Sequence, residues 1–247
     1  MFLKEFELAK NIASSTAEML QTKYLSDAGI ISNDGKDIKT KADRAAHTYI
    51  IDRLSNTGIS IISEESNTLS FNINDRQWII DPIDGTFNMT RGFEMAAVSI
   101  SLWDNGSPIL GVIHDIYSDD VYSSFHNKGA HKNRQRIFLS TEKKKDQAIL
   151  ATGFPTGRDY SRDSLNDFIM NVQAYKKIRM LGSAALMLAY VACGYFDVYH
   201  EDDIFIWDVA AGLAIIAEAG GAYSIKPGSS ALKYNINASN NYLIDQI

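Results

Sequence analysis

The chain has 247 residues, of which 45% are hydrophobic and 22% charged, a composition typical of one globular domain or two closely joined halves. The net charge of -6 disfavours nucleic acid as the main ligand, because nucleic-acid-binding surfaces are usually basic. No apolar run approaches the roughly 20 residues that span a bilayer, and the first residues mix acidic with apolar side chains, unlike a secretory signal. We therefore expect a cytoplasmic protein.

The chain begins with a pattern of two amphipathic helices followed by strands. Apolar side chains recur at helical spacing over residues 1–21 and again over 41–55. Two short β-branched runs follow at 59–62 and 78–80, and each ends directly before acidic residues. We therefore expect two strands that deliver carboxylates at their carboxyl ends.

More strands are predicted in the rest of the first half, at about 96–103, 109–114 and 121–125. In the first of them, Val98, Ile100 and Leu102 alternate with small residues. Such alternation favours an antiparallel strand that is buried on one face only.

The second half repeats the mixture of strands and helices. Strands are predicted near 148–152, 195–200, 222–226 and 241–245, and helices near 162–175, 183–193 and 207–219. Gly220 and Gly221 provide a stop for the last helix. The whole order predicts an α+β fold with layered sheets and helices. The chain is expected to form a single domain, 1–247, with a division in the polar stretch near residue 140 between the halves 1–140 and 141–247.

Acidic residues stand at the ends of several predicted elements. They are Asp43 at the start of a helix, Glu64 and Glu65 after one strand, Asp81 and Asp84 after another, and Asp208 at the start of a late helix. Mg²⁺ prefers oxygen ligands, above all carboxylates, carbonyls and water. A turn held by Pro82 and Gly85 can direct Asp81, Asp84 and the Ile83 carbonyl toward one point. The spacing permits a metal site.

Each of these residues also has an ordinary structural explanation when it is taken alone. Asp and Gly are common turn residues, so the segment 81–85 is explained as a turn. Asp43 and Asp208 are explained as helix caps, and Glu64 as part of a solvated loop. Only the joint pattern along the chain favours a functional site.

That joint pattern resembles the inositol monophosphatase family of lithium-sensitive, magnesium-dependent phosphatases. Two long segments carry the resemblance: WIIDPIDGTFN at 78–88, and IWDVAAG at 206–212 followed by EAGG at 218–221. Shorter matches occur in the expected order: TKAD at 40–43, SEES at 63–66, GSAA at 182–185 and ASN at 238–240. The resemblance implies a layered αβαβα sandwich of the type shared with fructose-1,6-bisphosphatase, and it implies a homodimer.

The resemblance also implies roles for particular residues. Two or three Mg²⁺ ions would be held by Glu64, Asp81, the Ile83 carbonyl, Asp84 and Asp208. Thr86 and Asp43 would lie beside the attacking water, with Glu64 close to it, and the backbone N–H groups of Gly85 and Thr86 would face the phosphate. The implied reaction is direct hydrolysis of a phosphate monoester by a water that the metal activates, without a phosphoenzyme.

The substrate is expected to be a polyol or sugar monophosphate such as inositol 1-phosphate. By resemblance, Glu201 binds a ring hydroxyl and Ala184 belongs to the same branch of the family; a carboxylate accepts bonds from hydroxyls and repels a second phosphate. The alternatives are a 3′(2′),5′-bisphosphate nucleotidase and a fructose-1,6-bisphosphatase. The pair Asp202-Asp203 directly follows Glu201, so a shift of one residue changes the carboxylate that meets the substrate.

An alternative of another class is a non-catalytic role as a binding partner of the transcription machinery, which some bacterial members of the family have. No membrane and no direct contact with nucleic acid are expected, given the acidic balance of the chain.

Overall fold

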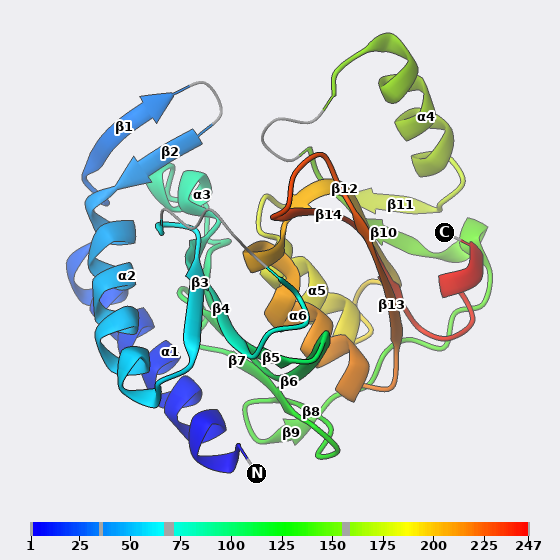
Figure 1. Cartoon of the computed structure of the whole chain (residues 1–247). Helices are drawn as coiled ribbons and strands as arrows, with labels where there is room; N and C mark the ends of the chain where they lie inside the picture. The colour runs from blue at the N-terminus through cyan, green and yellow to red at the C-terminus, as the bar shows by residue number, and fades with distance from the viewer. Residues whose placement is uncertain (1, 35–36, 67–71, 155–158, 247) are drawn as a thin grey trace.

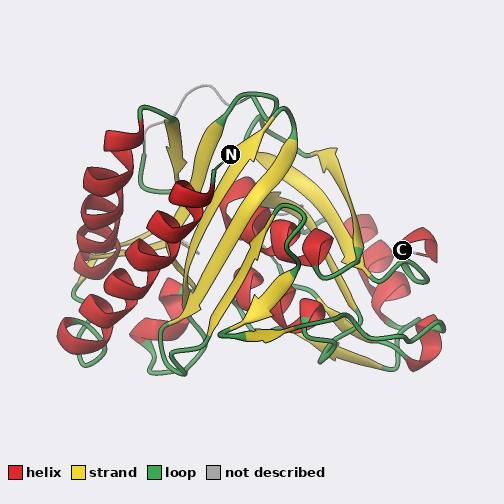
Figure 2. Ribbon diagram, turned by 90° about the horizontal axis from the view of Figure 1, so that it is seen from below, coloured by secondary structure: helices red, strands yellow, loops and turns green. Residues whose placement is uncertain are grey.

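The computed structural model describes residues 2–34, 37–66, 72–154 and 159–246, and these form two β-sheets with helices between and outside them (Figures 1 and 2). The α-helices are α1 (Leu3–Lys23), α2 (Lys41–Leu54), α3 (Thr86–Thr90), α4 (Arg162–Val172), α5 (Ala184–Ala192) and α6 (Ile206–Glu218). No helix within the described ranges is long and apolar enough to cross a membrane.

Seven strands form the larger sheet and five form the smaller one. The larger sheet consists, in spatial order, of β3 (Ser60–Ser63), β4 (Gln77–Asp84), β5 (Ala97–Asp104), β6 (Ser107–Asp115), β7 (Val121–Phe125), β8 (Ala130–Lys132) and β9 (Gln135–Arg136). The smaller sheet consists of β11 (Lys177–Arg179), β10 (Ile149–Ala151), β12 (Val198–Phe205), β14 (Lys233–Ser239) and β13 (Ala222–Pro227). A separate hairpin joins β1 (Ile30–Asp34) to β2 (Asp37–Thr40).

The helices and the two sheets alternate in five layers. Helices α1 and α2 pack on the outer face of the larger sheet around one apolar cluster. Helices α5 and α6 lie between the two sheets in a second cluster, and α4 packs on the outer face of the smaller sheet in a third. This order is an αβαβα sandwich, so the fold class predicted from the sequence is confirmed.

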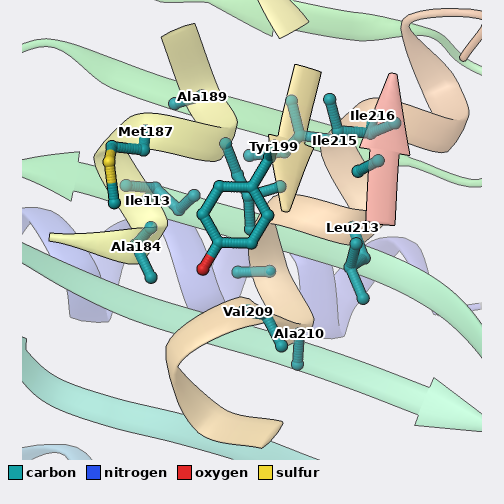
Figure 3. Packing of buried hydrophobic residues seen from close by; sticks show 14 of the residues in the cluster. Ile113, Ala184, Met187, Ala189, Tyr199, Val209, Ala210, Leu213, Ile215 and Ile216 are labelled. Atoms are coloured by element: carbon teal, nitrogen blue, oxygen red, sulfur yellow. The ribbon is translucent and has the colours of Figure 1, made fainter. Parts of the chain in front are cut away.

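The central layer is held closely against the larger sheet because small residues face each other there. A Cβ added to Gly111 of β6 would lie 2.4 Å from the carbonyl oxygen of Ala211 in α6. The indole Nε1 of Trp103 donates a hydrogen bond of 3.3 Å to the carbonyl of Ala210. Figure 3 shows the apolar side chains of α5 and α6 in this layer. The backbone of α6 therefore rests directly on the sheet, and its first turn is fixed relative to the strand ends.

Strand β5 differs from the prediction, because it is buried on both faces rather than one. Val98, Ile100 and Leu102 belong to the cluster under α1 and α2, as their alternation predicts. The small residues on the other face are covered by α6, and Ser101 satisfies its buried hydroxyl by donating to the carbonyl of Leu110 at 2.7 Å. Small polar side chains are therefore a sign of close packing here and not of exposure to solvent.

The last part of the chain also differs from the prediction. The strand expected at 241–245 is wrong, because this segment is a turn followed by a 3₁₀ turn at Ile244–Gln246. The closing strand is β14, which pairs with β12 on one side and β13 on the other. The strand expected at 195–200 is found as β12 three residues later. The hairpin β1–β2, helix α3 and the short strands β8, β9 and β11 were not predicted.

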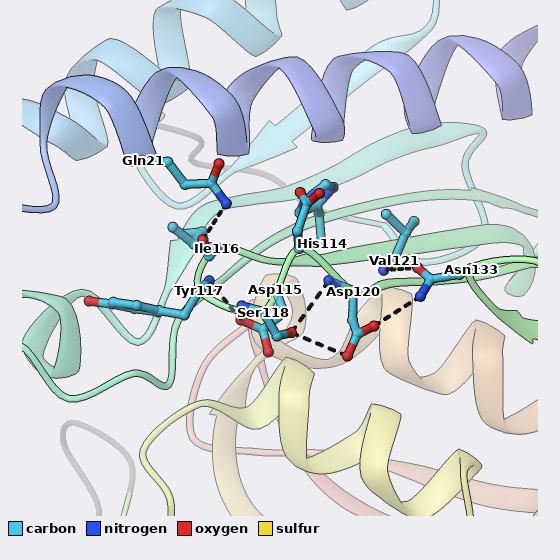
Figure 4. Close-up of polar contacts among 10 residues, drawn as sticks. Gln21, His114, Asp115, Ile116, Tyr117, Ser118, Asp120, Val121 and Asn133 are labelled. Atoms are coloured by element: carbon cyan, nitrogen blue, oxygen red, sulfur yellow. Dashed lines mark hydrogen bonds and ion pairs between the residues drawn. The ribbon is translucent and has the colours of Figure 1, made fainter.

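The turn after β6 joins the larger sheet to α1, as Figure 4 shows. The carboxylate of Asp115 accepts hydrogen bonds from the backbone N–H of Tyr117 at 2.9 Å and of Ser118 at 3.2 Å. The amide of Gln21 on α1 donates to the carbonyl of Ile116 at 2.7 Å. The hydrogen bonds that Asp115 accepts within the turn, together with the hydrogen bond from Gln21 on α1, thus fix this end of β6.

Candidate metal centre

The carboxylates of the candidate centre meet because β3 and β4 are parallel neighbours. Ser63 pairs with Ile80, so the two strands end at the same edge of the sheet. Glu64 follows β3, and its N–H continues the ladder to the carbonyl of Ile80 at 3.3 Å. Asp81 follows Ile80 within β4. The expectation that two strands deliver carboxylates at their carboxyl ends is therefore met by the fold.

A local irregularity of β4 turns two of its carboxylates toward one place. Pro82 has no N–H for the ladder, and the register with β5 shifts between Asp81 and Asp84. The N–H of Ile83 donates instead to Oδ1 of Asp81 at 3.0 Å. The carbonyl oxygen of Ile83 lies 2.8 Å from the hydroxyl oxygen of Thr86. The chain thus leaves the regular strand at the point where its acidic residues stand.

Asp208 completes the cluster from the first turn of α6. One carboxylate oxygen each of Asp81, Asp84 and Asp208 lies within 4.8 Å of the others. The position of Asp208 is fixed by its neighbour Trp207, whose ring is buried and stacks on Phe205 with centroids 4.5 Å apart. Asp208 is not the helix cap, since that position is Phe205. The explanation of Asp208 as a cap therefore fails, whereas the expected clustering is found.

The acids of the centre carry more negative charge than the surrounding protein offsets. Burial is the main cause that raises the pKa of Asp81 well above its ordinary value, and the charge of Glu64 is the next cause. Burial and the charge of Asp84 likewise raise the pKa of Asp208. Of the lysines and arginines that the structure describes, none forms an ion pair with Asp81, Asp84 or Asp208. Clustered hard oxygen donors without a counter-charge fit a divalent cation such as Mg²⁺.

Asp84 is held in place by the segment before α5. Its Oδ2 accepts a hydrogen bond of 2.5 Å from the Ser183 hydroxyl and one of 2.8 Å from the N–H of Ala185. Burial raises the pKa of Asp84 to about 6, and these hydrogen bonds act in the opposite direction. Ser183 also caps α5, because its Oγ accepts from the N–H of Leu186. Sequence reasoning gave Ser183 no role, although it lies within the GSAA match at 182–185.

Asn88 was also missed as a functional position, and it connects the segment 78–88 to the segment before α5. Its amide nitrogen lies 2.8 Å from the carbonyl of Leu181 and 3.2 Å from that of Gly182. The same nitrogen lies 2.9 Å from the carbonyl of Met95. Asn88 ends the WIIDPIDGTFN match, and that was the only signal in the sequence. Through it, the segment that carries Ser183 is tied to α3.

Asp43 caps the start of α2 and also contacts Thr86. Its Oδ2 accepts from the N–H of Thr40 at 2.8 Å, and the Thr40 hydroxyl caps the N–H of Asp43 at 3.2 Å, which together form a capping box. Its Oδ1 accepts a hydrogen bond of 2.9 Å from the Thr86 hydroxyl. Burial raises the pKa of Asp43, while its bonds to Thr40 and Thr86 lower it. The pair of Asp43 and Thr86 is therefore assembled beside the cluster.

Gly85 precedes α3 in a conformation that other residues avoid. Its φ is +90°, and an added Cβ would lie 2.5 Å from the carbonyl oxygen of Met95. Both the left-handed backbone and the close approach require glycine. Helix α3 then begins at Thr86.

Of the three consecutive carboxylates in β12, the fold directs Glu201 to the centre. A register shift lies between Glu201 and Ile204, where Asp203 has a φ of +59°. Asp203 accepts from the N–H of Ser229 at 2.7 Å and pairs with Lys233 at 3.1 Å. Glu201 is only 5% exposed, and its charge contributes to the raised pKa of Asp208.

Ala184 and Glu65 have different surroundings. Ala184 is buried at the first position of α5, directly after Ser183. Glu65 forms an ion pair of 3.2 Å with Lys39, whereas the charge of its neighbour Glu64 acts on Asp81 and raises the pKa of that residue.

Comparisons with known proteins agree with this geometry. A sequence model described as the inositol monophosphatase family matches residues 4–243. The chain is 36% identical over 203 residues to an inositol-1-monophosphatase of Mesorhizobium japonicum, which covers 81% of this chain and 76% of that protein. It is also 36% identical over 222 residues to the Nus factor SuhB of Escherichia coli, with 88% and 83% covered.

Solved structures show the same likeness. The structure of an inositol monophosphatase from Anabaena superposes with a TM-score of 0.85 at 32% identity, covering 98% of this chain and 93% of that one. The structure of the extragenic suppressor protein suhB from Bartonella henselae also gives a TM-score of 0.85, at 30% identity, with 97% and 95% covered. The likeness therefore extends over nearly the whole chain.

Proposed function

The chain belongs to the inositol monophosphatase family, and we propose that it hydrolyses a polyol or sugar monophosphate with the help of Mg²⁺. Membership of the family makes it a phosphatase; the substrate class and the metal ion are what the proposal adds. The observation that supports it most is the cluster of Asp81, Asp84 and Asp208 within 4.8 Å, to which the described residues supply no counter-charge.

The residues that would hold two or three Mg²⁺ ions are Glu64, Asp81, the carbonyl of Ile83, Asp84 and Asp208. When bound, Mg²⁺ supplies positive charge that offsets the charge of the phosphate and makes a neighbouring water more acidic. The backbone N–H groups of Gly85 and Thr86 would donate to the phosphate oxygens, because they stand at the free start of α3.

Thr86 and Asp43 would handle the proton of the attacking water. The Thr86 hydroxyl donates to Oδ1 of Asp43 over 2.9 Å, so its oxygen keeps lone pairs that can accept a bond from water. As the water attacks phosphorus, the P–O bond to the alcohol breaks and a second water protonates the departing alkoxide. The proton of the attacking water passes to Oγ1 of Thr86 while the hydroxyl proton passes to Asp43. Burial raises the pKa of Asp43 and makes it a better base. Glu64 would lie near the same water, and the reaction would need no phosphoenzyme.

Glu201 would select the alcohol part of the substrate. Its buried carboxylate accepts hydrogen bonds from hydroxyl groups and repels a second phosphate. Ala184, at the start of α5, has a small side chain that leaves room for a ring beside Glu201. These two residues favour an inositol-like monophosphate over a 3′(2′),5′-bisphosphate nucleotide or fructose 1,6-bisphosphate, which remain the alternatives.

A substrate panel tests the proposal. With Mg²⁺, we expect turnover of inositol 1-phosphate to exceed that of fructose 1,6-bisphosphate, 3′-phosphoadenosine 5′-phosphate and histidinol phosphate, and we expect a chelator to abolish it. Turnover that persists in the chelator would refute the metal mechanism. A preference for the adenosine compound would refute the role of Glu201. Isolation of a phosphorylated enzyme would refute direct attack by water.

A second candidate is a non-catalytic role as a partner of the transcription machinery. It is suggested by relatives that carry the name Nus factor, one of them 36% identical over 88% of this chain. The variant Asp81→Asn separates the two functions. It should abolish phosphatase activity while leaving a role that depends only on the protein surface intact.

Other expectations from the family are part of the same proposal. We propose a cytoplasmic homodimer that is inhibited by lithium, in which the chain forms one domain. The half 1–140 would supply most metal ligands and the half 141–247 the contacts with substrate, although Asp208 brings the second half into the centre as well. Light scattering measures the mass in solution, and a lithium titration of phosphatase activity measures the inhibition.

A further inference from the structure

Tyr199 has its hydroxyl group in an otherwise apolar layer of the molecule. The side chain is completely buried, and Figure 3 shows its ring among Ala184, Met187 and Val209. Its hydroxyl donates a hydrogen bond of 2.8 Å to Oε2 of Glu201. The two residues are two positions apart on β12, so their side chains lie on the same face of the sheet. The partner of the buried hydroxyl is thus the carboxylate that faces the candidate centre.

Gly153 bounds the same carboxylate on another side. A Cβ added to Gly153 would lie 2.7 Å from Oε1 and 3.0 Å from Oε2 of Glu201. A carboxylate cannot keep its position at that distance from a methyl group. The carboxylate of Glu201 therefore lies between the hydroxyl of Tyr199 and the backbone of Gly153. Both determine its orientation.

We propose that Tyr199 is a positioning residue that, together with Gly153, orients the Glu201 carboxylate to receive the hydroxyl groups of the substrate. The proposal rests on the proposed function, which gives Glu201 its contact with substrate. Because Tyr199 donates to one carboxylate oxygen and each oxygen accepts more than one bond, the carboxylate keeps acceptor capacity for a hydroxyl. A carboxylate that is already oriented loses less rotational freedom when the substrate binds.

The mechanism by which Tyr199 acts predicts an effect that depends on the substrate. An alkyl polyol phosphate presents hydroxyl groups to Glu201, whereas 4-nitrophenyl phosphate presents none. Loss of the Tyr199 hydroxyl should therefore reduce kcat/KM for the polyol compound more than for the aryl compound. A role in folding alone would lower the melting temperature and leave the ratio of the two kcat/KM values unchanged.

The experiment compares kcat/KM for inositol 1-phosphate and for 4-nitrophenyl phosphate at saturating Mg²⁺, with thermal melting as a measure of folding. The variants are Tyr199→Phe, Gly153→Ala and Glu201→Gln. We expect the ratio of inositol 1-phosphate to 4-nitrophenyl phosphate to fall about tenfold for the first two, the effect of one lost or misdirected hydrogen bond to a charged group. Tyr175→Phe is the matched control, because Tyr175 is also buried but lies in the cluster under α4; its ratio should equal that of the wild type.

The outcomes separate the positioning role from the proposed function. If Glu201→Gln lowers the ratio and both Tyr199→Phe and Gly153→Ala lower it as well, the positioning role is supported. If Glu201→Gln lowers the ratio and Tyr199→Phe leaves it unchanged, the positioning role is refuted and the substrate contact of Glu201 stands. An unchanged ratio in Glu201→Gln refutes both.

Discussion

Replacement of Asp81 by asparagine should stabilise the metal-free protein while it destroys the metal centre. Asp81 is 2% exposed and lies within 4.8 Å of Asp84 and Asp208 through one oxygen each. At that separation two unit charges repel each other by about 3 kcal/mol when the effective dielectric constant is about 20. An asparagine at position 81 removes this charge. Its carbonyl oxygen can still accept from the N–H of Ile83, and its NH₂ group can donate to the neighbouring carboxylates.

The gain is smaller than the full repulsion because the acids of the wild type take up protons. Burial and neighbouring charge raise the pKa of Asp81, so below about pH 4 the folded and unfolded chains both bind the proton and the substitution changes little. As the pH rises, the unfolded chain releases its proton first and the folded wild type loses stability. We expect Asp81→Asn to be more stable by about 2 kcal/mol at pH 7.5, a rise of about 4 to 8 °C in melting temperature.

Differential scanning calorimetry from pH 4 to 8, in chelator and in Mg²⁺, measures this effect. Mg²⁺ at about a hundred times its dissociation constant should stabilise the wild type by roughly 3 kcal/mol and should have little effect on Asp81→Asn. The control is Asp167→Asn, which removes a charge on the exposed face of α4 and should behave as the wild type. A lower melting temperature for metal-free Asp81→Asn at pH 7.5 would show that its hydrogen bonds outweigh the repulsion, which refutes the reasoning.

Three more substitutions test other parts of the structure. Thr86→Ala removes the donor to Asp43 and should lower kcat about 100-fold or more with an unchanged circular dichroism spectrum; a loss below tenfold would exclude Thr86 from the proton path. Gly111→Ala places a Cβ 2.4 Å from the α6 backbone and should cost about 2 kcal/mol in urea unfolding, whereas an unchanged midpoint would contradict the close packing. Glu218→Gln weakens the acceptor of the N–H groups at 127–129, three bonds of 2.8 to 3.1 Å, and should cost about 1 to 2 kcal/mol by the same assay; its hydrogen exchange at 127–129 should become faster, and unchanged protection would refute this.

Local patterns in the sequence were sufficient for the elements whose environment follows from nearby residues. Helices α1 and α2 and strand β7 have the bounds that periodicity predicts, within about three residues. The acidic residues at strand ends were recognisable for the same reason. The motif WIIDPIDGTFN combines a β-branched run, which predicts a strand, with a proline and a glycine, which predict a turn. Its length made the family recognisable without the fold.

Elements that depend on distant partners were not determined by local pattern. The strand predicted at 241–245 is absent, and β14 forms at Lys233–Ser239 because β12 and β13 provide its hydrogen bonds on both sides. The small side chains of β5 suggest a solvent-exposed face when the sequence is read alone, but in the fold α6 covers them. In both cases a distant segment contributes to the structure: β12 pairs with β14, and α6 covers β5.

The site shows the same division between sequence and tertiary structure. The sequence identified Asp81, Asp84 and Asp208 as candidate ligands of one metal site. Their approach to within 4.8 Å depends on how α6 packs across the sheet. The sequence left open which of the consecutive acids at 201–203 would meet a substrate. In the fold, Asp203 is held by Ser229 and Lys233 at a bulge, while Glu201 is buried with its charge near Asp208. Residue types are a property of the chain, whereas the direction of a side chain depends on packing, register and hydrogen bonds that form only in the folded molecule.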